Sequence, residues 1–395
     1  MEEKSDREEA RVIVTAKAPV NIAVIKYWGK RDEGLILPLN SSLSTTLSMA
    51  DLCTTTTVMV SERWERDRLW LNGAEEDLQG NSRFQNCLQE LRRRRRKNRG
   101  GEEEGEEGHF HIHSTNNFPT AAGLASSASG FACLTFALAQ LLQVEGELTA
   151  VARMGSGSAC RSLHGGFVLW SKGEKEDGSD SIATQVCDEN HWPELQVLIC
   201  VASAKKKAVS STSGMQTSVQ TSKLLHYRAE QVVEQRIKEM EDAIKQKDFE
   251  RFGKLTMQDS NQFHAICLDT YPPIFYMNDT SKAIVHLVTA YNKYYKEIRA
   301  AYTFDAGPNA VIYLLQEHLP EFLSLLLQFF PSETTNGNSY LLSSSLSTEE
   351  TAELGDEALV SSIGFEKAQF ADSLQQIIHT KVGGGPFVVE RSVRE

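Results

Sequence analysis

The sequence predicts an α+β protein of two domains, a strand-rich half followed by a half in which helices precede strands. The first assignment rests on residues 12–60, where β-branched residues alternate or crowd together. The second rests on the segment after Leu224, where apolar residues recur at helical spacing. Residues 203–220, rich in Ser, Lys and Thr, separate these patterns, so we expect one domain over residues 1–203 and another over 204–395.

Shorter elements follow from local patterns. A strand over residues 69–71 ends at an Asn-Gly turn, and a helix begins near Ser82 and runs through Leu91. The other expected elements are a buried helix over residues 124–142, interior strands over 165–170 and 197–202, a helix over 284–295 and a loop over 343–353.

Composition excludes several classes of protein. The 395 residues are 41% hydrophobic and 24% charged, which is typical of a globular chain that buries a large core. The net charge of −12 argues against a general binder of nucleic acid or of membrane surfaces. The 7 cysteines are scattered and never in CxxC spacing, which favours reduced thiols in the cytosol over a disulfide or zinc framework. The N-terminus does not resemble a signal peptide and no apolar run is long enough to span a membrane, so we expect a soluble intracellular protein.

A strongly charged stretch runs from Arg92 to Glu107. Five arginines and a lysine over residues 92–97 are followed, after Asn98 and Arg99, by glycines and then by glutamates. A nuclear import signal is one interpretation, and a loop whose opposite charges neutralise each other is the other. We favour the loop, over residues 92–108.

Three histidines, His109, His111 and His113, share one face of a predicted strand. A metal site is conceivable because imidazole is a common ligand. Alternate positions on one strand splay apart, however, so the three rings are poorly placed to share one ion. We therefore expect a solvated strand face.

Residues 304–310 (FDAGPNA) place one carboxylate, Asp305, between an apolar strand and a tight turn. A second apolar strand follows from residue 310. An acid in this position is partly desolvated and rigidly aimed, which suits a general base. Taken alone, however, Asp305 favours the interpretation of an aspartate that only caps its own turn.

Residues 119–128 (PTAAGLASSA) lead small residues directly into a helix. Unpaired backbone N–H groups at such a helix start suit phosphate oxygens, and Ser126 and Ser127 add hydroxyls for phosphate or Mg²⁺. The segment is not a Walker A loop. A tightly packed Ala-rich helix explains the same residues equally well.

Two further segments gather cations. Residues 155–161 (GSGSACR) form a glycine-serine turn that ends in Arg161, whose planar fork suits a carboxylate or phosphate. Residues 18–31 set Lys26, Lys30 and Arg31 at the end of an apolar strand beside aromatic residues. The alternatives are a surface arginine on a flexible loop and a solvated strand end.

The joint order of KYWGKR, PTAAGLASSA, GSGSACRS and FDAGPNA closely resembles the mevalonate diphosphate decarboxylases of the GHMP small-molecule kinase superfamily. The resemblance spans nearly the whole chain. It implies an α+β fold with an N-terminal ribosomal-S5-like half, a C-terminal ferredoxin-like half and an active site in the cleft between them. It also implies a cytosolic homodimer that acts on mevalonate 5-diphosphate with ATP and Mg²⁺, and binds neither nucleic acid nor membranes.

The resemblance further implies roles for individual residues. Asp305 would act as base on the C3 hydroxyl, Arg161 would hold the carboxylate beside Asn21, and Lys26 would pair with Asp305. The substrate would be contacted by Tyr27, Trp28, Gly29, Lys30, Arg83, Ser156, Gly157, Ser158, Ala159, Cys160 and Thr212. The ATP phosphates would be cradled by Pro119, Ala121, Ala122, Gly123, Leu124, Ala125, Ser126 and Ser127, with Ser127 directed at the γ-phosphate or Mg²⁺.

Three other functions stay open at this point. One is a superfamily kinase that phosphorylates mevalonate or phosphomevalonate without decarboxylation, and CO₂ release would distinguish it. Another is a catalytically silent ligand sensor, which would have no need of Asp305. The third, nucleic-acid binding through Arg92 and its neighbours, would be weak and sensitive to salt.

Overall fold

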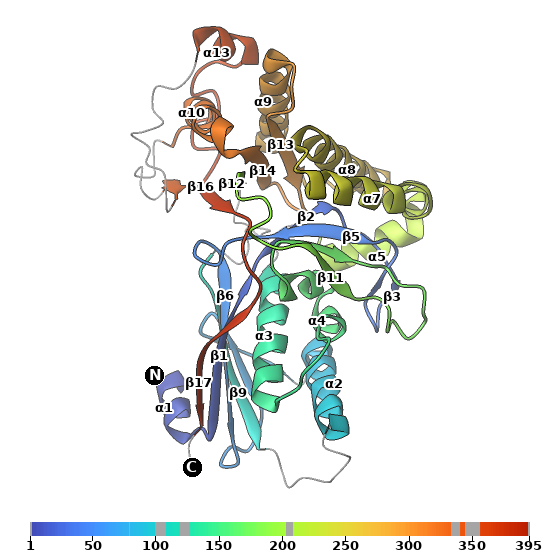
Figure 1. The fold of residues 1–395 in the computed structure, drawn as a ribbon, viewed down its shortest axis with the longest axis vertical. Coiled ribbons are helices and arrows are strands. Elements are labelled where there is room, and N and C mark those ends of the chain that lie inside the picture. The colour runs from blue at the N-terminus through green and yellow to red at the C-terminus, as the bar shows by residue number, and fades with distance from the viewer. Residues whose placement is uncertain are drawn as a thin grey trace.

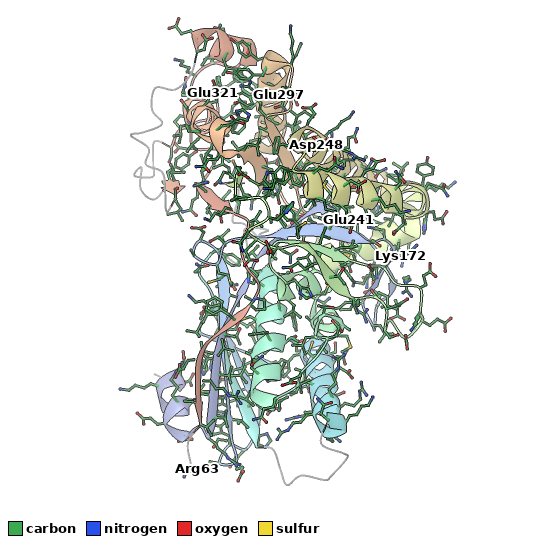
Figure 2. The ribbon with its side chains drawn as sticks, viewed as in Figure 1. Arg63, Lys172, Glu241, Asp248, Glu297 and Glu321 are labelled. Carbon is green, nitrogen blue, oxygen red and sulfur yellow. The ribbon has the colours of Figure 1, made fainter. Side chains whose placement is uncertain are left out.

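The structure is a computed structural model that describes residues 2–78, 80–98, 108–118, 126–202, 208–332, 340–343 and 356–393. Figure 1 shows an elongated molecule in which two halves lie end to end, with both chain termini at the same end. Figure 2 gives the same view with side chains, where Arg63 marks the end with the termini and Glu297 and Glu321 mark the opposite end.

The half that holds the termini is built on a six-stranded sheet in the order β17-β1-β6-β9-β7-β8. Its strands are β1 (Val12–Pro19), β6 (Cys53–Ser61), β7 (Arg68–Leu71), β8 (Ala74–Glu76), β9 (His109–Asn116) and β17 (Phe387–Val393). The short helix α1 (Glu2–Glu9) lies beside it. The expected strands within residues 12–60 and at residues 69–71 are confirmed.

A second, four-stranded sheet crosses the middle of the molecule in the order β11-β10-β5-β2. Its strands are β2 (Asn21–Ile25), β5 (Ser42–Thr46), β10 (Phe167–Trp170) and β11 (Ala183–Cys187). The small ribbon of β3 (Lys30–Asp32) and β4 (Leu37–Pro38) follows β2. This sheet carries Asn21 at the start of β2 and delivers Lys26 just beyond its end.

In the part of this half that the structure describes, the further helices are α2 (Ser82–Asn98), α3 (Ser126–Leu142), α4 (Thr149–Gly155) and the 3₁₀-helix η1 (Gly157–Leu163). The buried face of α3 is largely Ala, Cys and Leu, and it packs against β1 and β6. The described part of the predicted helix over 124–142 is therefore confirmed. Small side chains allow its close approach to the sheet.

The predicted loop over residues 92–108 is wrong at its beginning, because α2 continues to Asn98. Arg and Lys have good helix propensity, and Glu90 accepts hydrogen bonds from Arg93 at 2.7 Å and from Arg94 at 2.8 Å. Basic residues in the last turn also stabilise the helix, because their positive charge interacts favourably with the negative end of the helix dipole. Residues 99–107 lie outside the described residues.

The predicted solvated histidine face is also wrong. The His111 ring stacks on Trp64 at 3.8 Å and the His113 ring stacks on Trp70 at 4.2 Å, measured between ring centroids. Asp6 of α1 lies 2.9 Å from His111 and 3.0 Å from His113. This acid is far away in the sequence, and only the docking of α1 on the sheet brings it to the histidines.

The other half is built on a five-stranded sheet in the order β13-β14-β12-β16-β15. Its strands are β12 (Leu195–Val201), β13 (Ala300–Phe304), β14 (Ala310–Leu315), β15 (Leu341–Leu342) and β16 (Gln376–Lys381). The strands expected on either side of Asp305 are confirmed as β13 and β14. Residues 344–353, most of the predicted loop over 343–353, lie outside the described residues.

The helices among the described residues of this half are α5 (Ser211–Thr221), α6 (Lys223–Tyr227), a π-helical turn η2 (Arg228–Val232), α7 (Val233–Gln246), α8 (Phe249–Asp269), α9 (Asp279–Tyr295), η3 (Gln316–His318), α10 (Leu319–Phe329) and α13 (Glu357–Ile363). The amphipathic helix expected after Leu224 and the helix expected over 284–295 are confirmed. The latter begins earlier, at Asp279, because Asn278 and Ser281 form a capping box.

The sheet pairing differs from a division at residue 203 in two places. Strand β12 precedes that residue but lies between β14 and β16 in the second half. Strand β17 is near the end of the chain but pairs with β1 in the first half. In addition, α5 occupies residues 211–220 of the expected boundary over 203–220. The two halves are thus joined by several chain crossings.

Their contact is a continuous apolar core. Ile22 and Val24 of β2 belong to the same buried cluster as Val197 of β12 and Phe252 of α8. A hydrogen bond of 2.7 Å between the Thr45 and Tyr313 hydroxyls also links the halves. This packing fixes the end of β2 against α8. Among the helices that the structure describes, none combines the length and apolar character needed to cross a bilayer.

Candidate active site

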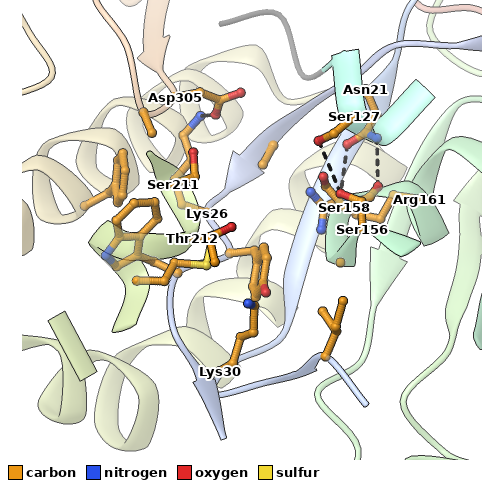
Figure 3. Close-up of a pocket in the computed structure, with 18 of the residues that line it drawn as sticks. Asn21, Lys26, Lys30, Ser127, Ser156, Ser158, Arg161, Ser211, Thr212 and Asp305 are labelled. Atoms are coloured by element: carbon orange, nitrogen blue, oxygen red, sulfur yellow. Dashed lines mark hydrogen bonds and ion pairs between the residues drawn. The ribbon is translucent and has the colours of Figure 1, made fainter. Parts of the chain in front are cut away.

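A cavity of about 390 Å³ lies where the two halves meet, and Figure 3 shows the side chains around it. Both halves contribute to its wall. The cavity is lined by Asn21, Ala23, Lys26, Tyr27, Trp28, Lys30, Ile36, Arg83, Ser126, Ser127, Ser156, Gly157, Ser158, Arg161, Ser211, Thr212, Met215, Phe263, Asp305 and Ala306.

Asp305 and Lys26 form one side of the cavity (Figure 3). Asp305 follows directly after β13, and its Oδ1 lies 2.6 Å from Lys26 Nζ. The lysine side chain is 3% exposed and the carboxylate 32% exposed. The turn after Asp305 is closed by its main chain, since the Gly307 N–H donates to the Asp305 carbonyl at 2.7 Å. The carboxylate is therefore held by a lysine that is far away in the sequence, and it faces the cavity.

Asn21 and Arg161 lie on the opposite side (Figure 3). Arg161 Nε donates to Asn21 Oδ1 at 3.3 Å and to Ser44 Oγ at 3.1 Å. Asn21 Nδ2 in turn donates to the Ser158 carbonyl at 3.0 Å and to Ser162 Oγ at 2.8 Å. These bonds fix the guanidinium plane and the amide of Asn21.

The guanidinium of Arg161 is poised for an anion. Its Nη1 is buried and has no hydrogen-bond partner among the described residues. Burial lowers the pKa of this group from its ordinary value. A carboxylate that enters the cavity would supply both the missing acceptor and a compensating charge.

Hydroxyl groups line the wall between these two sides. Ser127, in the first turn of α3, lies 3.3 Å from Ser156, Oγ to Oγ. The first N–H groups of α3 and its dipole favour negative charge at this point. The predicted phosphate loop, Pro119 to Ala125, lies outside the described residues, so Ser126 and Ser127 are its described members.

Cations and an aromatic hydroxyl line the rest of the cavity. Lys30 Nζ lies 2.5 Å from Glu33, and Arg83 donates to Thr212 Oγ1 at 3.2 Å. The Tyr27 hydroxyl is buried, and burial raises its pKa. A polyanion could bind here because these groups carry positive charge or donate hydrogen bonds.

His264 of α8 was not predicted from the sequence. Burial, aided by the charge of Lys26, lowers its pKa to about 4. The ring is therefore neutral near pH 7 and adds no further positive charge beside Lys26.

Three predicted contact residues, Gly29, Ala159 and Cys160, are absent from the described lining of the cavity. Gly29 has φ +87° and serves the turn after Trp28, where a Cβ would lie 2.8 Å from Leu39. Ala159 and Cys160 are fully buried. They belong to the buried residues of the 3₁₀-helix η1 and therefore support this segment rather than line the cavity.

Six lining residues were missed: Ala23, Ile36, Ser211, Met215, Phe263 and Ala306. Ser211 and Met215 belong to α5, whose N-cap Ser210 accepts from the Ser213 N–H. Two serines and a threonine over residues 210–212 were a helix-start signal that could have identified α5. The apolar members had no comparable signal.

A second cavity of about 350 Å³ adjoins the first, since Ser126 and Ser127 line both. Its other lining residues come from β7, β8 and the turn between them, from β9 and α3, and from the start of α2 and the residue before it: Leu69, Leu71, Asn72, Glu76, Asn81, Phe84, Ser114, Asn116, Gly130, Phe131 and Leu134. The N-terminus of α3 thus lies between a polar cavity and a more apolar one.

This geometry can bind a polyanion, hold a carboxylate and present a base to one of its hydroxyl groups. Comparison with known proteins points to the same chemistry. The diphosphomevalonate decarboxylase-like N-terminal domain matches residues 18–183, and the mevalonate 5-diphosphate decarboxylase C-terminal domain matches residues 197–389.

The diphosphomevalonate decarboxylase of Danio rerio is 57% identical over 380 residues, which cover 96% of this chain and 93% of the relative. The structure of the mevalonate diphosphate decarboxylase from Trypanosoma brucei has a TM-score of 0.83 and 39% identity, and the match covers 96% of this chain and 98% of that one. A structure of MDDEF in complex with MVAPP, AMPPCP and magnesium has a TM-score of 0.71 and 30% identity, with 96% and 99% coverage. Together with the two domain matches, these similarities show that the chain belongs to the mevalonate diphosphate decarboxylase family.

Proposed function

We propose that this chain converts mevalonate 5-diphosphate and ATP to isopentenyl diphosphate, CO₂, phosphate and ADP. The observation that carries the proposal is the arrangement of Asp305 and Lys26 opposite Arg161 and Asn21 across one cavity. A substrate with a carboxylate and a tertiary hydroxyl on neighbouring carbons suits such a pair of walls. Membership of the family supplies the identity of that substrate.

Decarboxylation needs an acceptor for the electrons of the breaking C–C bond. ATP phosphorylates the C3 hydroxyl, and departure of that phosphate leaves positive character at C3. Electrons from the bond between C2 and the carboxylate carbon then form the new double bond, and CO₂ leaves.

Asp305 accepts the proton of the C3 hydroxyl as this oxygen attacks the γ-phosphorus. Lys26, 2.6 Å from Asp305, fixes the direction of the carboxylate and offsets the charge that gathers near the transferred phosphoryl group. Arg161 and Asn21 hold the substrate carboxylate, so that C3 faces Asp305 and the bond that breaks stays oriented.

The substrate diphosphate would be held by the remaining cations and hydroxyls. The residues that we assign to it are Tyr27, Trp28, Lys30, Arg83, Ser156, Ser158 and Thr212, all of which line the cavity. Several Lys and Arg donors suit a diphosphate because they neutralise its charge as well as donate hydrogen bonds.

ATP would bind with its phosphates at the N-terminus of α3. The shared position of Ser126 and Ser127 supports this, because a nucleotide in the second cavity could extend its phosphates into the first. The complex of MDDEF with MVAPP, AMPPCP and magnesium supports the binding of ATP and Mg²⁺ themselves. The hydroxyl of Ser127 is an oxygen ligand that Mg²⁺ accepts, and when bound Mg²⁺ would neutralise phosphate charge.

The experiment is an assay of the purified protein with mevalonate 5-diphosphate, ATP and Mg²⁺, following isopentenyl diphosphate, CO₂ and ADP together. We expect the three products in equal amounts. ADP formation without CO₂ would instead indicate a kinase that does not decarboxylate, and the absence of all three would favour a ligand sensor.

We further propose that the enzyme is a cytosolic homodimer, as the family resemblance implies. Light scattering on the purified protein and fractionation of cells would test this.

A further inference from the structure

Lys26 is held through its main chain as well as through its ammonium group. Its N–H donates to Asp259 Oδ1 at 2.7 Å, and its carbonyl accepts from Arg228 Nη2 at 3.1 Å. Asn40 Nδ2 also donates to that carbonyl, at 3.0 Å. Asp259 and Arg228 belong to α8 and η2, so the second half of the molecule fixes a residue of the first.

Arg228 and Asp259 are themselves joined in a rigid pair. Both guanidinium Nη atoms lie 2.8 Å from a different carboxylate oxygen of Asp259, and both side chains are 0% exposed. Arg236 adds a bond of 2.8 Å to Oδ2. Burial opposes the ionisation of Asp259, but the charges of the two arginines and the hydrogen bonds that it accepts lower its pKa below the ordinary value.

Stability alone is a weak reason for such a pair, because apolar residues of similar volume often stabilise a fold equally well. Arg228 also begins the π-helical turn η2, between α6 and α7. Single π-helical turns are frequent at functional sites. In this molecule the first residue of the turn is Arg228, whose buried guanidinium donates to the Lys26 carbonyl.

Helix α8, which holds Asp259, also anchors Asp305, the ion-pair partner of Lys26. Ser260, next to Asp259 in α8, accepts a hydrogen bond of 3.0 Å from the Phe304 N–H. Phe304 immediately precedes Asp305. Neighbouring residues of α8 therefore hold the main chain on both sides of the ion pair between Lys26 and Asp305.

We infer that Arg228 and Asp259 are positioning residues that hold Lys26 in register with Asp305. Neither residue is part of the described lining of the cavity, so they act through the main chain of Lys26 and do not touch the substrate. The inference deepens the proposed function and rests on it, since the ion pair that they align is the proposed base and its partner.

The test is a double-mutant cycle between Arg228→Gln and Lys26→Met, with kcat measured for CO₂ release. We expect Arg228→Gln to lower kcat by about tenfold or more while the KM for ATP changes by less than about threefold. In the Lys26→Met background, the same substitution should change kcat by less than about twofold, because there is no ammonium left to position. Equal losses in the two backgrounds would overturn the inference.

Arg236→Gln is the matched control, because Arg236 bonds to Asp259 and to Gln262, as Arg228 does, but the bond to the Lys26 carbonyl comes from Arg228. We expect its kcat to stay within about threefold of wild type. An equal fall in kcat for Arg228→Gln and Arg236→Gln would mean that both only compensate charge, and would overturn the inference. Arg228→Lys retains the charge and replaces Arg228→Gln if that variant does not fold.

Hydrogen exchange of the Lys26 amide gives a readout that needs no catalysis. The amide should exchange faster in Arg228→Gln than in wild type and Arg236→Gln, and unchanged protection would overturn the inference. If the wild type shows this protection but releases no CO₂, the proposed function fails while the positioning of Lys26 stands. If the wild type is active and the cycle is additive, only the positioning role fails.

Discussion

At the scale of single residues, the two walls of the cavity have different roles. One wall carries the proposed base, and the other binds an anion. Asp305 is only partly exposed and has a lysine within 2.6 Å. Arg161 is buried, with one guanidinium nitrogen unpartnered among the described residues. The first arrangement suits proton removal, and the second suits the binding of a carboxylate.

Asp305→Asn should leave ATP binding near normal. It should lower turnover by about 10²–10⁴-fold or more, because the amide cannot accept the hydroxyl proton. Steady-state CO₂ release and ATP binding by calorimetry would measure the two effects. Asp279→Asn is a suitable control, since that carboxylate is 96% exposed on α9 and should leave turnover unchanged. Near-normal turnover of Asp305→Asn would refute its role as a base.

Arg161→Gln should impair decarboxylation more than ATP binding. We expect CO₂ release to fall by about 10²-fold, because a buried charged hydrogen bond to the carboxylate is lost, while ATP affinity changes little. Rapid-quench measurement of CO₂ together with nucleotide binding separates the two. An equal loss of ATP affinity would assign Arg161 to the nucleotide.

At the scale of elements, η1 packs closely against Tyr27, which lines the cavity, and against Trp170. A Cβ on Gly157 would lie 2.9 Å from atoms of both Trp170 and Tyr27. The Tyr27 and Trp170 rings are themselves in edge contact, with centroids 4.7 Å apart. A side chain at residue 157 would therefore have to displace Tyr27 or the Trp170 ring that contacts it.

Gly157→Ala should raise the KM for mevalonate 5-diphosphate and destabilise the fold by about 1–3 kcal/mol through overpacking. Initial rates and urea unfolding would measure both changes. Gly34→Ala is the control, because a Cβ there would approach Asp32 no closer than 3.5 Å. An unchanged KM with intact stability would show that η1 can yield without moving Tyr27.

At the scale of the whole molecule, several buried groups couple stability to pH. The pKa of His264 is lowered to about 4 by burial, and burial also lowers the pKa of His111. A histidine with a depressed pKa binds fewer protons when folded, so stability falls as pH decreases from the unfolded value toward the folded one. The pKa of Asp259 is lowered as well, which removes further stability in more acidic solution.

We therefore expect the free energy of unfolding to decrease between pH 7.5 and pH 5, with up to about 2 kcal/mol from His264 alone. Urea unfolding at the two pH values would measure it. His264→Gln removes the titrating group and should reduce the dependence. A stability that rises toward pH 5 would contradict the burial of these histidines as neutral groups.

The order of most elements and the segments that carry chemistry could be predicted from the sequence alone. Hydrophobic period, turn residues and the glycine-serine segments are local signals, which is why β13, β14, the described part of α3 and the surroundings of Asp305 were found. The charged stretch after Leu91 was misread because helix propensity and side-chain pairing outweigh the apparent loop composition.

Tertiary structure decided the contacts between distant segments. The pairing of Lys26 with Asp305 was expected only through the resemblance, and its support by Arg228 and Asp259 was not expected at all. Tertiary structure also decided three other placements: Asp6 beside the histidines of β9, α5 on the cavity wall, and β17 in the first sheet. Each depends on how elements dock after they form, and pairing between segments that are far apart in the sequence leaves no local pattern comparable to the hydrophobic period of a single element.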